Sequence, residues 1–230
     1  MNLPNKITLT RIFMIPVFIA VFYCGILSPW CFLASAVVFL GAALTDALDG
    51  HIARSRHLVT DLGKFLDPIA DKVLVSTALI VLLTVPTAFT VDPFDAYGLI
   101  VAGVLVALVL ARELIVSGFR IIAAGKRLVL AADKLGKIKT VFQDVSIALL
   151  LASMTFLALG AEAVRDEFIL GAREEMLLNL YRAGEIIAYI GLVCFVLCSV
   201  LTVVSGVNYL VKNKKVLKDE KTEEGEGENS

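Results

Sequence analysis

Four aspartates with helical spacing are the residues of this 230-residue sequence best suited to chemistry. Asp46 and Asp49 are three residues apart and Asp67 and Asp71 are four apart, so each pair lies on one face if its segment is helical. Four unpartnered carboxylates that converge would repel one another, whereas hard divalent cations bind oxygen ligands of this kind. We therefore predict a site for two divalent cations, Mg²⁺ or Mn²⁺, an arrangement that can clamp a phosphoryl group during its transfer.

Small and basic residues surround these aspartates. Gly50 and Gly63 each remove a side chain close to a carboxylate, which leaves room for a phosphate or nucleotide to approach the backbone. Arg54 lies one helical turn beyond Gly50 and offers a guanidinium fork to a phosphate. The alternative is an acidic surface loop that only separates two apolar segments, but such a loop does not need this combination of residues. The joint pattern favours a phosphate-handling site.

The elements that position this site are predicted from hydropathy. The chain is 58% apolar with a mean hydropathy of +0.86, above the usual range of soluble domains. A helix needs about 20 mostly apolar residues to cross a hydrocarbon core about 30 Å thick. Six segments qualify: Ile7–Leu27, Cys31–Leu48, Asp67–Val85, Tyr97–Ser117, Ile138–Leu159 and Gly184–Val211. We expect an all-α polytopic membrane protein, a bundle of six transmembrane helices formed by residues 1–211.

The basic residues predict how the bundle is oriented. All but three of the 21 lysines and arginines fall at the termini or in alternate loops and their flanks, the exceptions being Arg165, Arg173 and Arg182. Excess lysine and arginine marks the cytoplasmic side of a membrane. We therefore expect a protein of the cytoplasmic membrane with both termini and the aspartate site on the cytoplasmic side. Residues 212–230 turn basic and then acidic and are predicted to form a disordered charged tail. The net charge of −1 gives no reason to expect a nucleic-acid partner.

A second group of residues that could bind an anion is basic. Arg112, Arg120, Lys137 and Lys139 lie at or near the predicted inner ends of apolar segments. One interpretation is that Arg112 pairs with Glu113 or another acid, while the other three only follow the charge rule for cytoplasmic loops. The other interpretation is a basic pocket that binds the dianionic phosphate of an acceptor.

The aspartate segment resembles a known family. Residues 46–71 match D-x2-D-G-x2-A-R-x8-G-x3-D-x3-D, the signature of the CDP-alcohol phosphotransferases, at all eight fixed positions. The resemblance implies that the four aspartates hold two divalent cations and that Asp71 is also the general base. It further implies that Gly50, Arg54 and Thr60 contact the CDP part of the lipid substrate, with Gly63 beside them.

The likeness extends over about 210 residues. The opening segment 2–11 is similar to that of bacterial phosphatidylglycerophosphate synthases in this family, where a Pro-Asn turn, here Pro4-Asn5, lies by the nucleotide. Segments 111–113 and 136–140, with Gln143, are similar to the same enzymes, although cardiolipin synthases look alike there. The family likeness also implies a homodimer embedded in membrane lipids.

The expected reaction transfers the phosphatidyl group of CDP-diacylglycerol to sn-glycerol 3-phosphate and releases CMP. The same chemistry with phosphatidylglycerol, serine or inositol phosphate as the acceptor is the nearest alternative, and a neutral acceptor would not need four basic residues. A cation-coupled transporter is the alternative from another class. Transporter sites, however, usually lie near the membrane midplane, whereas these carboxylates are predicted at the inner face.

Overall fold

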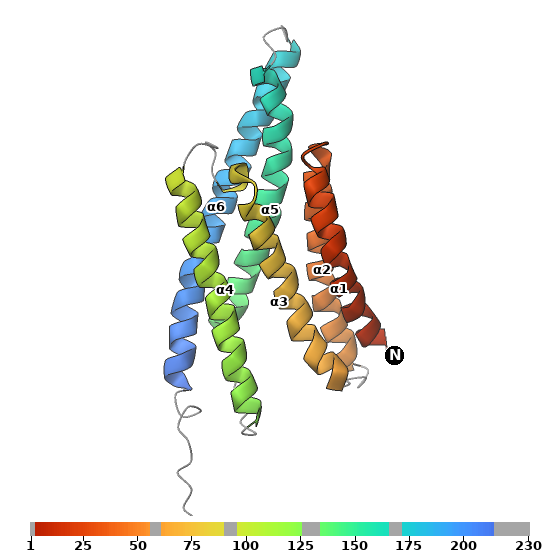
Figure 1. The fold of residues 1–230 in the computed structure, drawn as a ribbon, viewed down its shortest axis with the longest axis vertical. Coiled ribbons are helices and arrows are strands. Elements are labelled where there is room, and N and C mark those ends of the chain that lie inside the picture. Colours follow the sequence, from red (N-terminus) through yellow and green to blue (C-terminus); the bar gives the residue numbers. More distant parts are fainter. Residues whose placement is uncertain (1–2, 56–60, 90–95, 126–133, 166–171, 214–230) are drawn as a thin grey trace, which may run out of the picture.

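The computed structural model of this chain describes residues 3–55, 61–89, 96–125, 134–165 and 172–213, and these residues contain no strand. Within these residues the fold consists of six α-helices and one short 3-10 helix (Figure 1). Their bounds are α1 Leu3–Cys24, α2 Trp30–Ser55, α3 Asp61–Leu83, η1 Pro86–Ala88, α4 Ala96–Gly125, α5 Lys134–Arg165 and α6 Ala172–Lys212. The prediction of an all-α bundle with six helices is confirmed.

The six helices alternate in direction along the bundle (Figure 1). The first residues of α1, α3 and α5 and the last residues of α2, α4 and α6 lie at the same end, drawn at the bottom of the figure. We call this the lower end. It brings together the helix ends that carry the four aspartates and the four basic residues singled out above.

The turn between α1 and α2 forms where Ser28-Pro29 predicts it. The Ser28 N–H donates to the Cys24 carbonyl at 3.0 Å, and the Phe32 N–H donates to the Pro29 carbonyl at 3.1 Å. A Cβ on Gly25 would lie 2.4 Å from the ring of Phe32, so the turn closes only because residue 25 has no side chain. This close approach sets α1 beside α2.

Aromatic and aliphatic side chains fill the centre of the bundle. Phe18 of α1 and Phe39 of α2 are fully buried, with ring centroids 6.2 Å apart. Leu79 of α3, Leu150 of α5 and Phe195 of α6 belong to the same buried cluster. This core packs α1 on α3, α2 on α5, and α5 on α6, and so fixes the relative positions of helices that reach the lower end.

Helices α5 and α6 form a hairpin that extends past the rest of the bundle at the upper end (Figure 1). They contain 32 and 41 residues, which correspond to about 48 and 62 Å at 1.5 Å per residue. The predicted last span, Gly184–Val211, is therefore too short. The fifth predicted span, Ile138–Leu159, is also shorter than its helix, because α5 runs on to Arg165.

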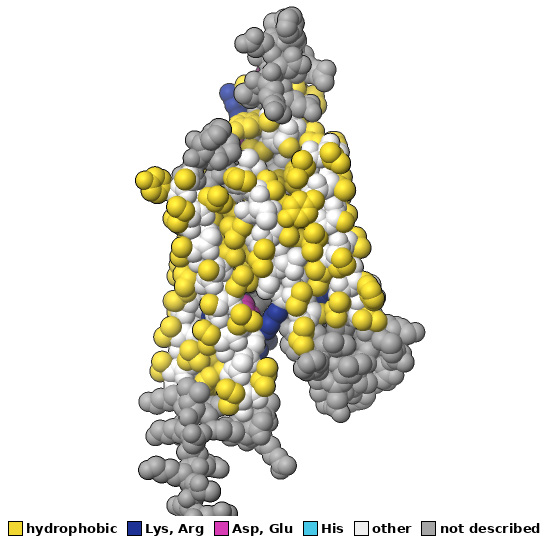
Figure 2. Space-filling model, viewed as in Figure 1, with side chains coloured by type: hydrophobic (Ala, Val, Ile, Leu, Met, Phe, Trp, Pro, Cys, Tyr) yellow, Lys and Arg dark blue, Asp and Glu magenta, His cyan; other side chains and the backbone are white. Residues whose placement is uncertain are grey.

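Among the residues that the structure describes, three helices are long and apolar enough to cross a membrane: Ala96–Ala123, Gly136–Ala161 and Glu175–Lys212. In α1, α2 and α3 the apolar stretches within the described residues are shorter: Leu9–Cys24, Trp30–Thr45 and Lys72–Leu83. Apolar side chains cover most of the face seen in Figure 2. These surfaces fit a lipid environment, while spanning by all six helices remains a prediction.

Residues 214–230, most of the predicted tail, lie outside the described residues. The division into a membrane domain, 1–211, and a disordered tail therefore remains a prediction.

Candidate functional site

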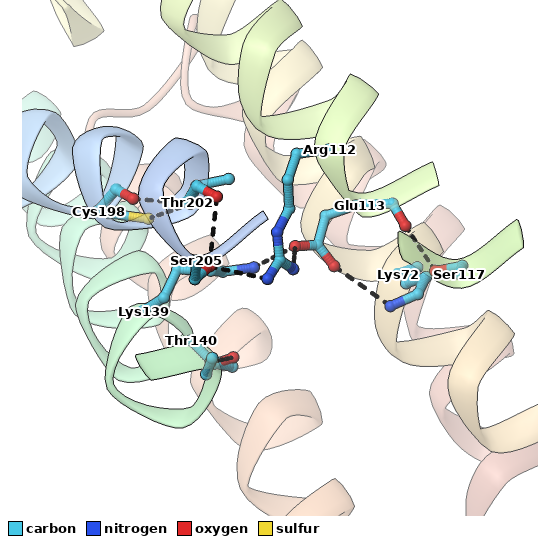
Figure 3. Close-up of polar contacts among 10 residues, drawn as sticks. Lys72, Arg112, Glu113, Ser117, Lys139, Thr140, Cys198, Thr202 and Ser205 are labelled. Atoms are coloured by element: carbon cyan, nitrogen blue, oxygen red, sulfur yellow. Dashed lines mark hydrogen bonds and ion pairs between the residues drawn. The ribbon is translucent and has the colours of Figure 1, made fainter. Parts of the chain in front are cut away.

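Glu113 of α4 is the centre of a polar cluster near the lower end (Figure 3). Its Oε2 accepts a hydrogen bond from Nζ of Lys72 at 3.2 Å, and its Oε1 accepts one from Nη1 of Arg112 at 3.0 Å. Nζ of Lys139 also donates to Oε1. The three cations come from α3, α4 and α5, so a single carboxylate joins three helices.

Helix α6 contributes to this cluster through Ser205 and Gly206. Nη2 of Arg112 donates to Oγ of Ser205 at 2.8 Å, and that hydroxyl in turn donates to the Thr202 carbonyl at 3.3 Å. A Cβ on Gly206 would lie 2.8 Å from Cγ of Arg112, so the glycine makes room for the arginine stem. We call Lys72, Arg112, Glu113, Lys139 and Ser205 the Glu113 cluster.

The Glu113 cluster carries more positive than negative charge in a sheltered place. Lys139 is only 3% exposed, and the side chains of Glu113, Arg112 and Lys72 are 18%, 15% and 29% exposed. Burying a charge is costly unless it is paired, and here three cations share one anion. Counted over these four described residues alone, the formal charge is +2, which a dianion such as a phosphate monoester would balance.

Donor groups remain free beside this excess charge. Nε of Arg112 and Nε2 of Gln143 are buried without a hydrogen-bond partner among the described residues. Gln143 lines a cavity of about 30 Å³, room for a water molecule. The other lining residues are Lys72, Val75, Ser76, Leu110, Glu113, Lys139 and Thr140. Figure 2 shows acidic and basic side chains at the top of a notch in the apolar surface near the lower end.

The structure separates the four basic residues predicted to bind an acceptor phosphate. Arg112 and Lys139 meet on Glu113. Lys137 is exposed, because residues two apart on a helix point to nearly opposite sides. The guanidinium of Arg120 lies 5.6 Å from the ring centroid of Tyr209, two turns along α4 from Arg112.

The backbone of the aspartate segment has the predicted helical form. Asp46 and Asp49 lie in the second half of α2, and Asp67 and Asp71 lie in the first half of α3. Their side chains fall outside the described residues, so their convergence remains a prediction. Among the side chains that the structure describes, no group of three or more histidines, cysteines or acids could hold a metal. Lys72 of the Glu113 cluster directly follows Asp71.

The residues predicted to contact the CDP part of the substrate are spread over three helices. Asn5 lies in α1, Gly50 and Arg54 in α2, and Gly63 in α3, while Thr60 lies outside the described residues. The expected Pro-Asn turn is instead the first turn of a helix, since α1 begins at Leu3. Proline fits that first turn because the N–H groups there have no partner within the helix.

Sequence reasoning named Arg112 and Lys139 as binding residues but gave no functional role to the rest of the Glu113 cluster. It considered Glu113 only as a partner for Arg112, and it used Lys72 only in the charge count of a loop. Charged residues inside an apolar segment are expensive and usually mark function, and this signal was available for Glu113. Nothing in the sequence marked Ser205 or Gly206 as partners of Arg112, which lies more than 90 positions earlier in the chain.

A helical bundle with three long apolar helices among the described residues, and a sheltered cluster of charged side chains near one end, is typical of a membrane protein. Comparison with known sequences makes the assignment specific. The CDP-alcohol phosphatidyltransferase family model matches residues 1–197. The chain belongs to this family, so it is a membrane transferase, and the transporter alternative is set aside.

Similar individual proteins share much of the chain. The CDP-diacylglycerol–glycerol-3-phosphate 3-phosphatidyltransferase of Bacillus subtilis (strain 168) is 44% identical over 166 residues, 67% of this chain and 79% of that protein. The protein of the same name in Rickettsia bellii (strain RML369-C) is 35% identical over 214 residues, 93% of this chain and 96% of that protein. A cardiolipin synthase (CMP-forming) of Oryza sativa subsp. japonica is 36% identical over 157 residues, 66% of this chain but 46% of that protein.

Proposed function

We propose that this chain transfers the phosphatidyl group of CDP-diacylglycerol to sn-glycerol 3-phosphate, giving phosphatidylglycerophosphate and CMP. Relatives that match more than nine-tenths of the chain bear the name of this activity. The observation that carries the choice of acceptor is the pairing of Lys72, Arg112 and Lys139 with the single carboxylate of Glu113.

The acceptor phosphate binds to the Glu113 cluster. Arg112 offers the unpaired Nε, and Lys139 supplies a sheltered ammonium. Charge-assisted hydrogen bonds from such groups are about twice as strong as neutral ones. Arg120 and Lys137 lie outside the cluster. They attract the phosphate electrostatically from the mouth of the site and do not contact it once it is bound.

The aspartates form the metal site. Asp46, Asp49, Asp67 and Asp71 lie on helical backbone near the lower end of α2 and α3, with spacings that put each pair on one face, and carboxylates are the donors that Mg²⁺ and Mn²⁺ prefer. Two bound cations would neutralise these carboxylates and offset the charge of the substrate pyrophosphate. Asn5, Gly50, Arg54, Thr60 and Gly63 are the proposed contacts for the CDP moiety.

The chain's own residues then act on the acceptor. Asp71 accepts the proton of the acceptor's hydroxyl group. The resulting oxygen attacks the lipid-side phosphorus of CDP-diacylglycerol, the new P–O bond forms, and the bond from that phosphorus to CMP breaks. Arg112 and Lys139 orient the acceptor by its phosphate, so that its hydroxyl is directed towards the helix turn that carries Asp71.

The placement of the protein follows from the same proposal. The lower end faces the cytoplasm in a multi-pass protein of the cytoplasmic membrane. The start of α1 and the end of α6 lie there, and most lysines and arginines of the sequence belong to the segments that adjoin the helix ends on that side. Glycerol 3-phosphate reaches the site from water and CDP-diacylglycerol from the bilayer. The protein acts as a homodimer, as family resemblance implies.

A second candidate function is cardiolipin synthesis, favoured by the likeness to the rice cardiolipin synthase. Its acceptor, phosphatidylglycerol, has a phosphodiester with one negative charge, which matches the excess of two positive charges less well. The test uses purified protein with CDP-diacylglycerol, Mg²⁺ and a panel of acceptors: glycerol 3-phosphate, phosphatidylglycerol, serine, inositol phosphate and glycerol. We expect CMP release with glycerol 3-phosphate far above the others. Release with phosphatidylglycerol alone would assign the chain to cardiolipin synthesis.

A further inference from the structure

We infer that Glu113 is a positioning residue that holds the acceptor-binding cations in register with the helix turn that carries Asp71. The inference rests on the proposed function and goes beyond it, because it assigns a role to a carboxylate that touches neither metal nor substrate. The carboxylate acts through Lys72, Arg112 and Lys139.

The first argument is the connectivity of the carboxylate. Both oxygens of Glu113 are used, Oε2 by Lys72 and Oε1 by Arg112 and Lys139. Each long basic side chain has many rotamers, and an ion pair fixes it in one of them. A single residue therefore orders cations from three helices at the same time.

The second argument is the position of Lys72. It follows Asp71 in α3, so a bond from its ammonium to α4 restrains the helix turn that carries the proposed base. On the other side, the Arg112 guanidinium is restrained by Ser205 of α6. Glu113 thus connects the phosphate-binding cations to the helix turn that carries the proton acceptor, Asp71. For catalysis, the spacing between these two parts of the site must match the distance between the phosphate and the hydroxyl group of the acceptor.

The third argument is electrostatic. Without Glu113, three cations in a sheltered site would repel one another and move apart, since Lys139 is almost fully buried. With Glu113 the cluster has an excess of two positive charges, which is equal in size and opposite in sign to the charge of the acceptor phosphate. The opposing view is that Glu113 competes with the phosphate as an anion. The two views predict opposite changes in the affinity for glycerol 3-phosphate.

The test compares Glu113→Gln with wild type and with Glu185→Gln, a matched change of a half-buried glutamate in the upper half of α6. The readouts are kcat, the KM of glycerol 3-phosphate, the KM of CDP-diacylglycerol and the thermal unfolding midpoint in detergent. For Glu113→Gln we expect the acceptor KM to rise at least about tenfold and kcat to fall several-fold, since charge-assisted bonds are lost. The KM of CDP-diacylglycerol should stay within about twofold. Glu185→Gln should behave as wild type.

Two further variants keep the test decisive. Glu113→Asp retains the charge on a shorter stem, so it should fold even if Glu113→Gln does not, with an acceptor KM raised a few-fold. The Lys72→Met variant removes the ammonium of α3 that donates to Glu113. The double variant Glu113→Gln/Lys72→Met should then have a kcat close to that of Glu113→Gln alone. Such non-additivity is the sign that both residues act through one contact.

The outcomes separate this inference from the proposed function. If wild type releases no CMP with glycerol 3-phosphate, the proposed function is wrong. If wild type is active and Glu113→Gln leaves the acceptor KM unchanged or lowers it, Glu113 is not a positioning residue. An equal rise in both KM values would mean a general structural role and would also overturn the inference. Full additivity of the Glu113 and Lys72 variants would overturn the link to the Asp71 turn.

Discussion

At the upper end of the bundle α5 and α6 meet through glycine, and near the lower end they take part in a cluster of charged side chains. A Cβ on Gly160 would lie 2.5 Å from Cβ of Tyr181 and 2.6 Å from its Cα, so the two helices touch backbone to side-chain stem. Gly206 of α6 makes room for Arg112 of α4 instead. The same residue type therefore serves close helix packing in one region and the seating of a cation in the other.

The difference follows from what stabilises each region in a membrane. Lipid tails are as apolar as the helix surfaces, so helices associate through close van der Waals contact, which small residues permit. The upper region needs nothing else. The lower region keeps charged groups in a sheltered place, where they are costly, and such a cost indicates function rather than stability. Perturbing the lower region should change catalysis, and perturbing the upper region should change stability.

The largest expected effect is removal of the divalent cations. Thorough chelation should abolish CMP release, because four carboxylates would then be left to repel both one another and the substrate pyrophosphate. Measuring CMP release before and after dialysis against a chelator, and again after Mg²⁺ is restored, checks this. Full turnover without metal would remove the basis for the aspartate site.

Next in size is the loss of the proposed base. Asp71→Asn should keep the fold, because the amide is nearly isosteric with the carboxylate, while kcat should fall by about 10²–10⁴-fold. Asp67→Asn should instead shift the Mg²⁺ concentration needed for half-maximal activity. A titration of the activity of both variants against Mg²⁺ distinguishes the roles. A near-normal kcat for Asp71→Asn at saturating Mg²⁺ would exclude it as the base.

The smallest effects come from two matched glycine substitutions. Gly160→Ala should lower stability by about 1–3 kcal/mol, because the added methyl meets backbone atoms of Tyr181 that cannot move aside. Its acceptor KM should equal that of wild type. Gly206→Ala should do the reverse: it displaces the Arg112 stem and raises the acceptor KM a few-fold, with little loss of stability. Thermal unfolding and steady-state kinetics on both variants check the pair, and an identical pattern in the two would remove the distinction between the regions.

The sequence predicted the helices better than their lengths. Hydropathy located six helices, but it began the last predicted span only at Gly184, because Glu175 and Arg182 interrupt the apolar run before it. Helix α6 includes these residues because it packs closely on α5, where Gly160 of α5 meets Tyr181 and Gly184 of α6 meets Leu157. Hydropathy does not report such contacts. Tertiary contact, not local preference, set this boundary.

The candidate site, too, was predictable only where its pattern lies within a single helix. Spacing along one helix identified the aspartate pairs, and the positive-inside rule identified the basic end. Spacing within one helix does not reveal which helices are neighbours, so the meeting of Lys72, Arg112 and Lys139 on one carboxylate was not predicted. It also could not separate Lys139 from Lys137, because both are lysines of the same short segment.

Those two lysines provide the most direct test of the account. Lys139 is buried against Glu113, whereas Lys137 is exposed to solvent two residues earlier in the same helix. One charge-assisted contact is worth about 1.5–3 kcal/mol, so Lys139→Met should raise the KM of glycerol 3-phosphate by roughly 10–150-fold. Lys137→Met should raise it by less than about threefold, since an exposed charge contributes little through water. The KM of CDP-diacylglycerol should hardly change in either variant. Equal effects of the two substitutions on the acceptor KM, or no effect of Lys139→Met, would contradict the claim that the Glu113 cluster binds the acceptor phosphate.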